Sequence, residues 1–213
     1  DRRAFLKVTG LAGGGLLLGM TFAPGSLIAQ ELGTLVGSAE LNVYVKVASD
    51  GTITILSANP EMGQGIKTAL PMIVAEEMGA LWSDVVVEQS DVDATRYGGQ
   101  FSGGSTNIPR SFDLMRTMGA SAREMLIGAA SDAMELPRSE LKARDSTVVH
   151  LFSKEQLSFG DLAAAAAKQD LPDPTSLKFK KPDEYTILGK SVSGVDNLQI
   201  VTGSSLYGID ALV

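Results

Sequence analysis

A long helical pattern in residues 109–136 constrains the fold more than any other feature of the sequence. Apolar and small side chains recur there every three or four residues, which places them on one face of an α-helix. Pro109 favours a helix start, because a residue in the first turn needs no partner for a backbone N–H. Methionine at this spacing indicates core packing rather than a set of ligands. The predicted buried face consists of Phe112, Met115, Met118, Ala122, Met125, Ala129 and Ala133.

The residues before this helix predict a β-hairpin and a second helix. Residues 41–47 (LNVYVKV) alternate between apolar and polar, the period of a half-buried strand, and residues 52–57 (TITILS) supply the return strand. The Asp50-Gly51 pair between them is a strong turn signal. Residues 67–80 have helical character, with Pro71 expected in the first turn. The predicted buried stripe of this helix is Ile66, Leu70, Ile73 and Val74.

Shorter elements complete the predicted order. Residues 84–90 (DVVVEQS) read as a strand, and the segments STVVHLF and QLSF predict a second hairpin around Ser153-Lys154. Ser158 and Asp161 have the spacing of a capping box, which starts a short alanine-rich helix. Because strands and helices are mixed along the chain, the sequence predicts an α+β (mixed α/β) fold.

The composition excludes several classes of site. The chain has no cysteine, which rules out a disulfide framework, a thiolate metal site and an iron–sulfur cluster within it. Its single histidine, His150, cannot build a histidine metal cage and is expected to be a surface or hydrogen-bonded residue. A net charge of −7 argues against a nucleic-acid partner, because phosphate contacts need clustered Lys and Arg.

The first thirty residues predict an export signal. Two adjacent arginines in the segment RRAFLK resemble the twin-arginine type, which exports folded proteins to the periplasm through the twin-arginine machinery. The apolar run that follows, at about 8–22, is shorter than the ~20 residues that span a membrane. An uncleaved signal would keep the protein at the membrane. A buried N-terminal helix is the alternative, and we expect the chain to be the N-terminal part of a longer protein.

Two glycine-rich loops, each followed by a helix, are the candidate ligand-binding feature. The segments MGQG (62–65) and GGSTN (103–107) combine glycines with hydroxyl and amide side chains. Glycines let a backbone approach a ligand closely, and a helix start offers unpaired N–H groups to an anion. These loops suit a polar organic ligand that carries phosphate, and loops that only connect elements are the alternative. The first segment does not match a P-loop, because Pro60 stands at the position of its first glycine. It does not match the Rossmann pattern either, because Thr68 stands at the position of the third glycine.

Read in order, four segments resemble a known family. They are EMGQG (61–65), VAEEMG (74–79), VEQSDVD (87–93) and GGQFSGGSTNI (98–108). Together they resemble the molybdenum-binding subunit of the xanthine dehydrogenase and aldehyde oxidase family. Within it the sequence is most similar to the exported branch that contains the large (beta) subunit of isoquinoline 1-oxidoreductase and periplasmic aldehyde dehydrogenases. The segment at 188–210 is similar to that branch's approach to its next domain.

The resemblance implies a cofactor and a set of binding residues. The cofactor would be molybdenum-molybdopterin, in the cytosine dinucleotide form, with its metal held by the pterin sulfurs and not by side chains of the protein. The residues that the resemblance assigns to cofactor binding are Gly63, Gln64, Gly65, Gly103, Gly104, Ser105, Thr106 and Asn107.

The resemblance also implies an activity and partners. The whole enzyme would be a molybdenum hydroxylase that oxidises aldehydes or hydroxylates N-heterocycles, with electrons leaving through a small [2Fe–2S] subunit and then a cytochrome c subunit. The family's catalytic glutamate lies in a C-terminal Gly-Glu motif that this chain does not match. No catalytic residue is therefore assigned, and the chain alone is expected to be inactive. Glu61 is expected to shape its loop and Glu77 to be a solvated or capping helix residue. The alternative function is an exported, non-redox domain that binds a nucleotide or another phosphorylated ligand.

The predicted organisation has four parts. Residues 1–30 are the export signal and residues 38–170 are the molybdopterin-binding domain portion. Residues 171–198, which contain proline and lysine, form a connector. Residues 199–213 begin a hammerhead-like (a/b hammerhead) domain and are expected to start a strand region.

Overall fold

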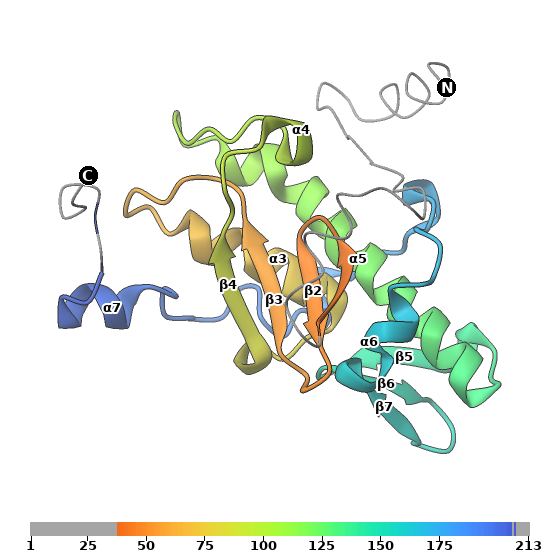
Figure 1. The fold of residues 1–213 in the computed structure, drawn as a ribbon. Coiled ribbons are helices and arrows are strands. Elements are labelled where there is room, and N and C mark those ends of the chain that lie inside the picture. Colours follow the sequence, from red (N-terminus) through yellow and green to blue (C-terminus); the bar gives the residue numbers. More distant parts are fainter. Residues whose placement is uncertain (1–37, 206, 208–213) are drawn as a thin grey trace, which may run out of the picture.

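The computed structural model describes residues 38–205 and 207, so the predicted export signal lies outside the described residues. Figure 1 shows a sheet with two long helices behind it, and a second, smaller sheet to one side. The strands are β1 (Ser38–Asn42), β2 (Val45–Ala48), β3 (Ile53–Ser57), β4 (Val85–Gln89), β5 (Leu141–Arg144), β6 (Thr147–His150) and β7 (Gln156–Ser158). The helices are α3 (Ile66–Met78), α4 (Ala94–Tyr97), α5 (Asn107–Met134), α6 (Phe159–Ala166) and α7 (Asn197–Thr202).

The first sheet has the strand order β1-β2-β3-β4. Strand β2 pairs antiparallel with β1 and β3, as the turn at Asp50-Gly51 predicted, whereas β3 and β4 are parallel. Helix α3 forms the crossover between the two parallel strands and packs on β3. Since parallel strands end at the same edge of a sheet, the loops that follow β3 and β4 emerge next to each other. These are the two loops that carry the glycine-rich segments.

The second sheet has the order β5-β6-β7, with both pairs antiparallel. It confirms the predicted hairpin around Ser153-Lys154. The capping box is also confirmed: the Ser158 hydroxyl accepts a hydrogen bond from the Asp161 N–H, and the Asp161 carboxylate accepts one from the Ser158 N–H. Strand β5 was not predicted, because its alternating pattern spans only the four residues LKAR.

The core lies between the first sheet and the two long helices. The stripe predicted for α3 is buried, and α3 packs along α5. Gly119 of α5 lies at their closest approach, where a Cβ atom would meet the Val74 carbonyl oxygen and come within 2.9 Å of the Glu77 Cβ. The predicted face of α5 is buried or half-buried except for Ala133, which is exposed.

Three further expectations are corrected. Residues 41–47 are not one strand, because the Asn42 side-chain oxygen accepts a hydrogen bond from the Tyr44 N–H and turns the chain between β1 and β2. Pro71 lies in the second turn of α3. Residues 197–202 form helix α7 rather than a strand, and Gly203 ends it in the left-handed conformation, with a φ of 71°.

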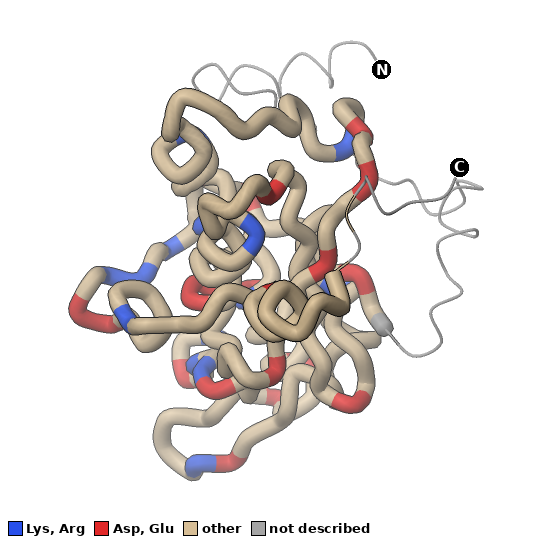
Figure 2. The backbone as a smooth tube through the Cα atoms, turned by 90° about the vertical axis from the view of Figure 1, so that its left-hand side faces the viewer, with Lys and Arg blue, Asp and Glu red and all other residues tan. Residues whose placement is uncertain are grey.

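The mixed α+β class is confirmed, with the domain boundaries at 38–170, 171–198 and 199–213 remaining predictions. Among residues 38–205 and 207, no helix is both long and apolar enough to cross a membrane. In the view of Figure 2, basic and acidic positions are scattered over the described backbone, and the basic ones form no continuous stripe.

Candidate functional site

The two glycine-rich loops lie side by side and are joined by hydrogen bonds. The Asn59 side-chain amide donates to the carbonyl of Phe101 at 3.0 Å, and the Ser102 hydroxyl donates to the carbonyl of Pro60 at 2.7 Å. The Gln100 side-chain amide donates to the carbonyl of Ala58 at 3.0 Å. Segments more than forty residues apart in sequence therefore form one surface at the carboxyl ends of β3 and β4.

The first loop holds a conformation that needs its glycines. Gly63 and Gly65 have φ angles of 95° and 81°, in the left-handed region that other residues rarely adopt. No atom lies within 4 Å of where a Cβ would stand at either position, so open space borders the backbone there. Gln64 folds back on the loop, donating to the Pro60 carbonyl at 3.0 Å and accepting from the Met62 N–H at 2.6 Å.

Glu61 occupies the start of α3. Its carboxylate accepts hydrogen bonds from the N–H groups of Gly63 at 2.7 Å, Gly65 at 2.9 Å and Lys67 at 2.9 Å. Burial tends to raise the pKa of this carboxyl, but these backbone hydrogen bonds outweigh it and hold the pKa below its ordinary value. The predicted role of Glu61 in shaping the loop is confirmed. The expectation that the start of α3 offers free N–H groups to an anion is wrong, because Glu61 fills that position.

The second loop leaves more of its donors free. Ser105 is exposed and has a φ of 55°, an uncommon and strained conformation for a residue with a side chain. The Thr106 hydroxyl donates to the Gly103 carbonyl at 3.0 Å, and the Asn107 amide donates to the Ser102 hydroxyl at 2.7 Å. The backbone N–H groups of Asn107 and Ile108, in the first turn of α5, have no acceptor among the described residues. Gly104, directly before Ser105, also has a left-handed backbone conformation.

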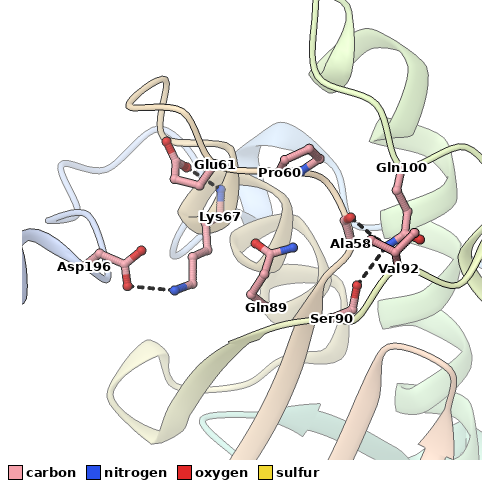
Figure 3. Close-up of a pocket in the computed structure, with 9 residues that line it drawn as sticks. All are labelled: Ala58, Pro60, Glu61, Lys67, Gln89, Ser90, Val92, Gln100 and Asp196. Carbon is pink, nitrogen blue, oxygen red and sulfur yellow. Dashed lines mark hydrogen bonds and ion pairs between the residues drawn. The ribbon is translucent and has the colours of Figure 1, made fainter. Parts of the chain in front are cut away.

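An open pocket of about 400 Å³ lies beside the loops, at the carboxyl ends of β3 and β4 (Figure 3). Its only charged groups are Glu61, Lys67 and Asp196, and the Lys67 ammonium lies 2.8 Å from the Asp196 carboxylate. None of the eight predicted cofactor-binding residues lines this pocket. The residues that do are Ala58, Pro60, Glu61, Lys67, Gln89, Ser90, Val92, Gln100 and Asp196.

No sequence pattern assigned a role to Lys67 or Asp196. Lys67 comes two positions after the end of the first glycine-rich loop, and this position was a signal that could have drawn attention to it. Asp196 is 129 residues away from Lys67, and no local pattern relates the two.

A second polar cluster lies at the opposite end of α3, and we call it the Glu76–Glu77 clamp. Glu76 is fully buried, and its carboxylate accepts hydrogen bonds from the Lys180 ammonium at 2.7 Å, the Ile187 N–H at 2.6 Å and the Leu188 N–H at 3.1 Å. Burial tends to raise the pKa of Glu76, but the bonds from Lys180, Ile187 and Leu188 outweigh it and hold the pKa below its ordinary value. The segment at 180–188 is thereby fixed to α3.

Glu77 completes the clamp on the side facing α5. It is 1% exposed, so the expectation of a solvated residue is wrong. Its carboxylate accepts hydrogen bonds from the Arg116 Nε at 2.6 Å and the Lys180 N–H at 3.0 Å, and it lies 3.4 Å from an Arg123 nitrogen. Every charge in this cluster is matched within the protein, which gives it a structural role.

The remaining candidates are also satisfied within the protein. His150 contacts the Ser153 hydroxyl at 2.7 Å and the Glu140 carboxylate at 3.1 Å, as expected for a hydrogen-bonded histidine. Trp82 packs against the core, whereas Phe101 is largely exposed beside Gly103. Within the described part of the chain, no group of three or more His, Asp or Glu side chains could hold a metal ion.

The two loops fit a polar organic cofactor that carries phosphate. Open space beside Gly63 and Gly65 lets a ligand approach the backbone, and the start of α5 supplies free N–H donors on the neighbouring loop. The side chains of Gln64, Ser105, Thr106 and Asn107 in these loops are neutral hydroxyls and amides, which can donate and accept hydrogen bonds.

Comparisons with known proteins show a family for the chain as a whole. A family described as "Molybdopterin cofactor-binding domain" matches residues 9–197. Isoquinoline 1-oxidoreductase subunit beta from Brevundimonas diminuta is 27% identical over all of this chain and 32% of its own length. A membrane-bound aldehyde dehydrogenase (pyrroloquinoline-quinone) from Gluconacetobacter polyoxogenes is 31% identical over 83% of this chain and 23% of its own length.

One solved structure that the chain matches is CO dehydrogenase from Oligotropha carboxidovorans. It matches with a TM-score of 0.49 and 19% identity over 57% of this chain and 15% of that chain. The chain thus spans about a third or less of the length of these curated relatives.

Proposed function

Because the chain belongs to the family of molybdopterin cofactor-binding domains, we propose that it forms the cofactor-binding part of a molybdenum hydroxylase. The whole enzyme oxidises aldehydes or hydroxylates aromatic N-heterocycles. The names of two relatives support this range, since one is an isoquinoline oxidoreductase subunit and the other an aldehyde dehydrogenase. The proposal concerns a polypeptide longer than this chain, because the chain covers at most 32% of those relatives.

The observation that carries the proposal is the pairing of the two glycine-rich loops. Hydrogen bonds join the loops, Gly63 and Gly65 border open space in the first, and Gly104 and Ser105 have left-handed backbone conformations in the second. The cofactor, in the cytosine dinucleotide form, supplies the redox chemistry when it is bound.

The chain's own residues bind and orient this cofactor. Backbone N–H groups of the second loop and of the first turn of α5 donate to phosphate oxygens. The Ser105 hydroxyl and the Gln64, Thr106 and Asn107 side chains donate to and accept from the polar ring. Gln64, Thr106 and Asn107 are bound within the loops in this structure, so they exchange these internal hydrogen bonds for bonds to the cofactor.

We further propose that the enzyme is periplasmic and passes electrons to a [2Fe–2S] partner subunit and then to a cytochrome c subunit. The adjacent arginines Arg2 and Arg3 support export through the twin-arginine route, which carries proteins that already hold a cofactor. An uncleaved signal would retain the protein at the membrane, and the name of the aldehyde dehydrogenase relative includes "membrane-bound". This chain has no cysteine, so the clusters of this proposal lie outside it.

Metal and pterin analysis tests the proposal. The longer natural polypeptide should be purified with its partner subunit from a host that makes the molybdenum cofactor. We expect about one molybdenum and one pterin per polypeptide, and a strong loss of both in Gln64→Ala. The matched control is Gln156→Ala, which makes the same change at an exposed position of β7 and should leave both values unchanged.

Two outcomes would overturn the proposal. Folded protein without molybdenum and pterin would favour a non-redox domain that binds another phosphorylated ligand. A bound quinone in place of the pterin, which the name of one relative suggests as an alternative, would assign a different redox cofactor.

A further inference from the structure

Lys67 lies at the candidate site but is not among the proposed cofactor-binding residues. It is the second residue of α3, two positions after the end of the first glycine-rich loop, and it is the only cationic side chain among the described residues that line the pocket. Its ammonium group lies 2.8 Å from the Asp196 carboxylate, and the two side chains are 19% and 26% exposed. Figure 3 shows this ion pair bridging α3 and the segment before α7.

The charges around the pocket make Asp196 the counter-ion of Lys67. The Glu61 carboxylate already accepts hydrogen bonds from three backbone N–H groups of its own loop and of α3. The Lys67 ammonium is therefore balanced by Asp196. A phosphate group that entered the pocket in this state would meet two carboxylates and one cation that is already paired, so it would be repelled. Phosphate can bind the Lys67 ammonium only if the ion pair between Lys67 and Asp196 breaks.

Asp196 is held at the end of a well-fixed segment. The Glu76–Glu77 clamp fastens residues 180–188 to the C-terminal end of α3. The Val195 N–H then donates to the Thr68 hydroxyl at 3.0 Å, and Asp196 reaches Lys67 in the next position. The segment thus runs along α3 from its C-terminal end to its N-terminal end, and it brings Asp196 to the pocket.

Residues 197–205 are mostly exposed, and their hydrogen bonds are made within residues 194–205. None of the residues of α7 is buried, and Leu198, Ile200 and Val201 are each more than half exposed. Figure 1 shows α7 set apart from the body of the molecule. Within residues 196–205, the Lys67–Asp196 pair is the one ion pair with a side chain of α3. Breaking it can release α7 without disturbing the core.

We propose that Lys67 is a cationic contact for a phosphate group of the cofactor, and that Asp196 takes the place of this phosphate in the unloaded protein. Binding exchanges one ion pair for another: the Lys67 ammonium leaves the Asp196 carboxylate and pairs with a phosphate oxygen. Residues 197–205 are then freed from α3. This inference rests on the proposed function, because it takes the cofactor's phosphate as the ligand.

Binding of inorganic pyrophosphate to the intact chain tests the exchange. By titration calorimetry, Lys67→Gln should weaken binding about tenfold, since it removes a charge-assisted contact. Asp196→Asn should strengthen binding several-fold, because it removes the competitor, and it should have no effect when combined with Lys67→Gln. Glu40→Gln is the control: it breaks the ion pair with Arg96 away from the pocket and should not change the affinity.

Hydrogen exchange supplies an independent readout. Saturating pyrophosphate should speed amide exchange in residues 197–205 and leave the amides of 186–188, which are held by Glu76, unchanged. Equal affinity in wild type and Lys67→Gln, or exchange in 197–205 that does not change or slows, would overturn the exchange of ion pairs.

Cofactor loading separates the two proposals. If the longer polypeptide carries full molybdenum and pterin and Lys67→Gln loses neither, the role of Lys67 is overturned and the proposed function stands. If pyrophosphate behaves as expected but no molybdenum or pterin is found, the Lys67–Asp196 exchange is supported and the proposed cofactor is overturned.

Discussion

The two ends of α3 each carry a carboxylate that accepts several hydrogen bonds, yet the two regions differ in what surrounds them. At the C-terminal end, Glu76 and Glu77 are buried, and their partners come from a segment more than 100 residues away and from α5. At the N-terminal end, Glu61 binds N–H groups of its own exposed loop, beside left-handed glycines and open space.

The difference distinguishes a structural cluster from a candidate binding site. A buried charge is tolerated only when its partners are all supplied by the protein. The carboxylates of the Glu76–Glu77 clamp are bonded in this way and are not available to a ligand. The glycine-rich loops keep a strained serine, free N–H donors and unfilled space, which cost stability and serve no packing purpose. Substitutions at the two ends should therefore separate stability from cofactor binding.

The largest effect is expected from Glu77→Gln, which leaves Arg116 and Arg123 without their buried counter-charge. We expect the free energy of unfolding to fall by about 3 to 5 kcal/mol in denaturant titrations of the intact chain. Glu124→Gln is the control, because Glu124 pairs with the same Arg123 at 3.5 Å but is 31% exposed; it should cost less than about 1 kcal/mol. Equal effects of the two substitutions would contradict a buried clamp.

Glu76→Gln should show the contribution of the clamp to the pH dependence. Since the pKa of Glu76 is lower in the folded than in the unfolded chain, this carboxylate stabilises the protein above its ordinary pKa of 4.5, and the contribution is lost as the pH falls below it. We expect the variant to lose about 2 to 3 kcal/mol at neutral pH. Between pH 5 and 3 its stability should fall less steeply than that of the wild type. A parallel pH profile for both proteins would show that Glu76 does not carry this dependence.

Gly119→Ala tests the close contact between α3 and α5. The added Cβ would collide with the Val74 carbonyl, and overpacking of this kind costs about 2 kcal/mol, more than alanine gains in helix propensity. Asp113→Ala, at an exposed position of the same helix, should be neutral or slightly stabilising. Thermal unfolding of both variants checks the pair, and a stabilised Gly119→Ala would mean that the helices can move apart freely.

The smallest effect on stability is expected in the loop, from Gly65→Ala. The left-handed backbone at this position costs about 1 kcal/mol for a residue with a Cβ, and the open space around it adds no clash. Gly99→Ala, where neither the backbone angle nor a neighbour demands glycine, is the control and should be neutral. We expect Gly65→Ala to lose most of its bound molybdenum despite this small change, and full retention of the metal would contradict the cofactor site.

The sequence predicted those features that depend on local spacing. The buried stripe of α3, the long helix α5, the turn at Asp50-Gly51 and the capping box of Ser158 and Asp161 each follow from residues a few positions apart. It also predicted the two loops, because glycines before a helix start form a local pattern.

The features that the sequence did not predict depend on contacts between residues that are far apart in the chain. Glu77 reads as a solvated helix residue, and only the contacts from Arg116 and from Lys180 show that it is buried. Residues 197–202 contain Ile200 and Val201, which favour a strand, but the left-handed cap at Gly203 accompanies a helix. The pairing of Lys67 with Asp196 across 129 residues has no signature in either local segment.

The most direct test of the account compares molybdenum content with stability in two variants. Ser105→Ala alters an exposed loop residue that contributes little to stability, and Gly119→Ala destabilises the core away from the loops. Molybdenum per folded polypeptide should be measured in the longer natural protein, and the free energy of unfolding in the intact chain. We predict that Ser105→Ala loses molybdenum while remaining as stable as the wild type, and that folded Gly119→Ala keeps it. Full molybdenum in Ser105→Ala, together with a loss in Gly119→Ala, would contradict the assignment of the cofactor site to the glycine-rich loops.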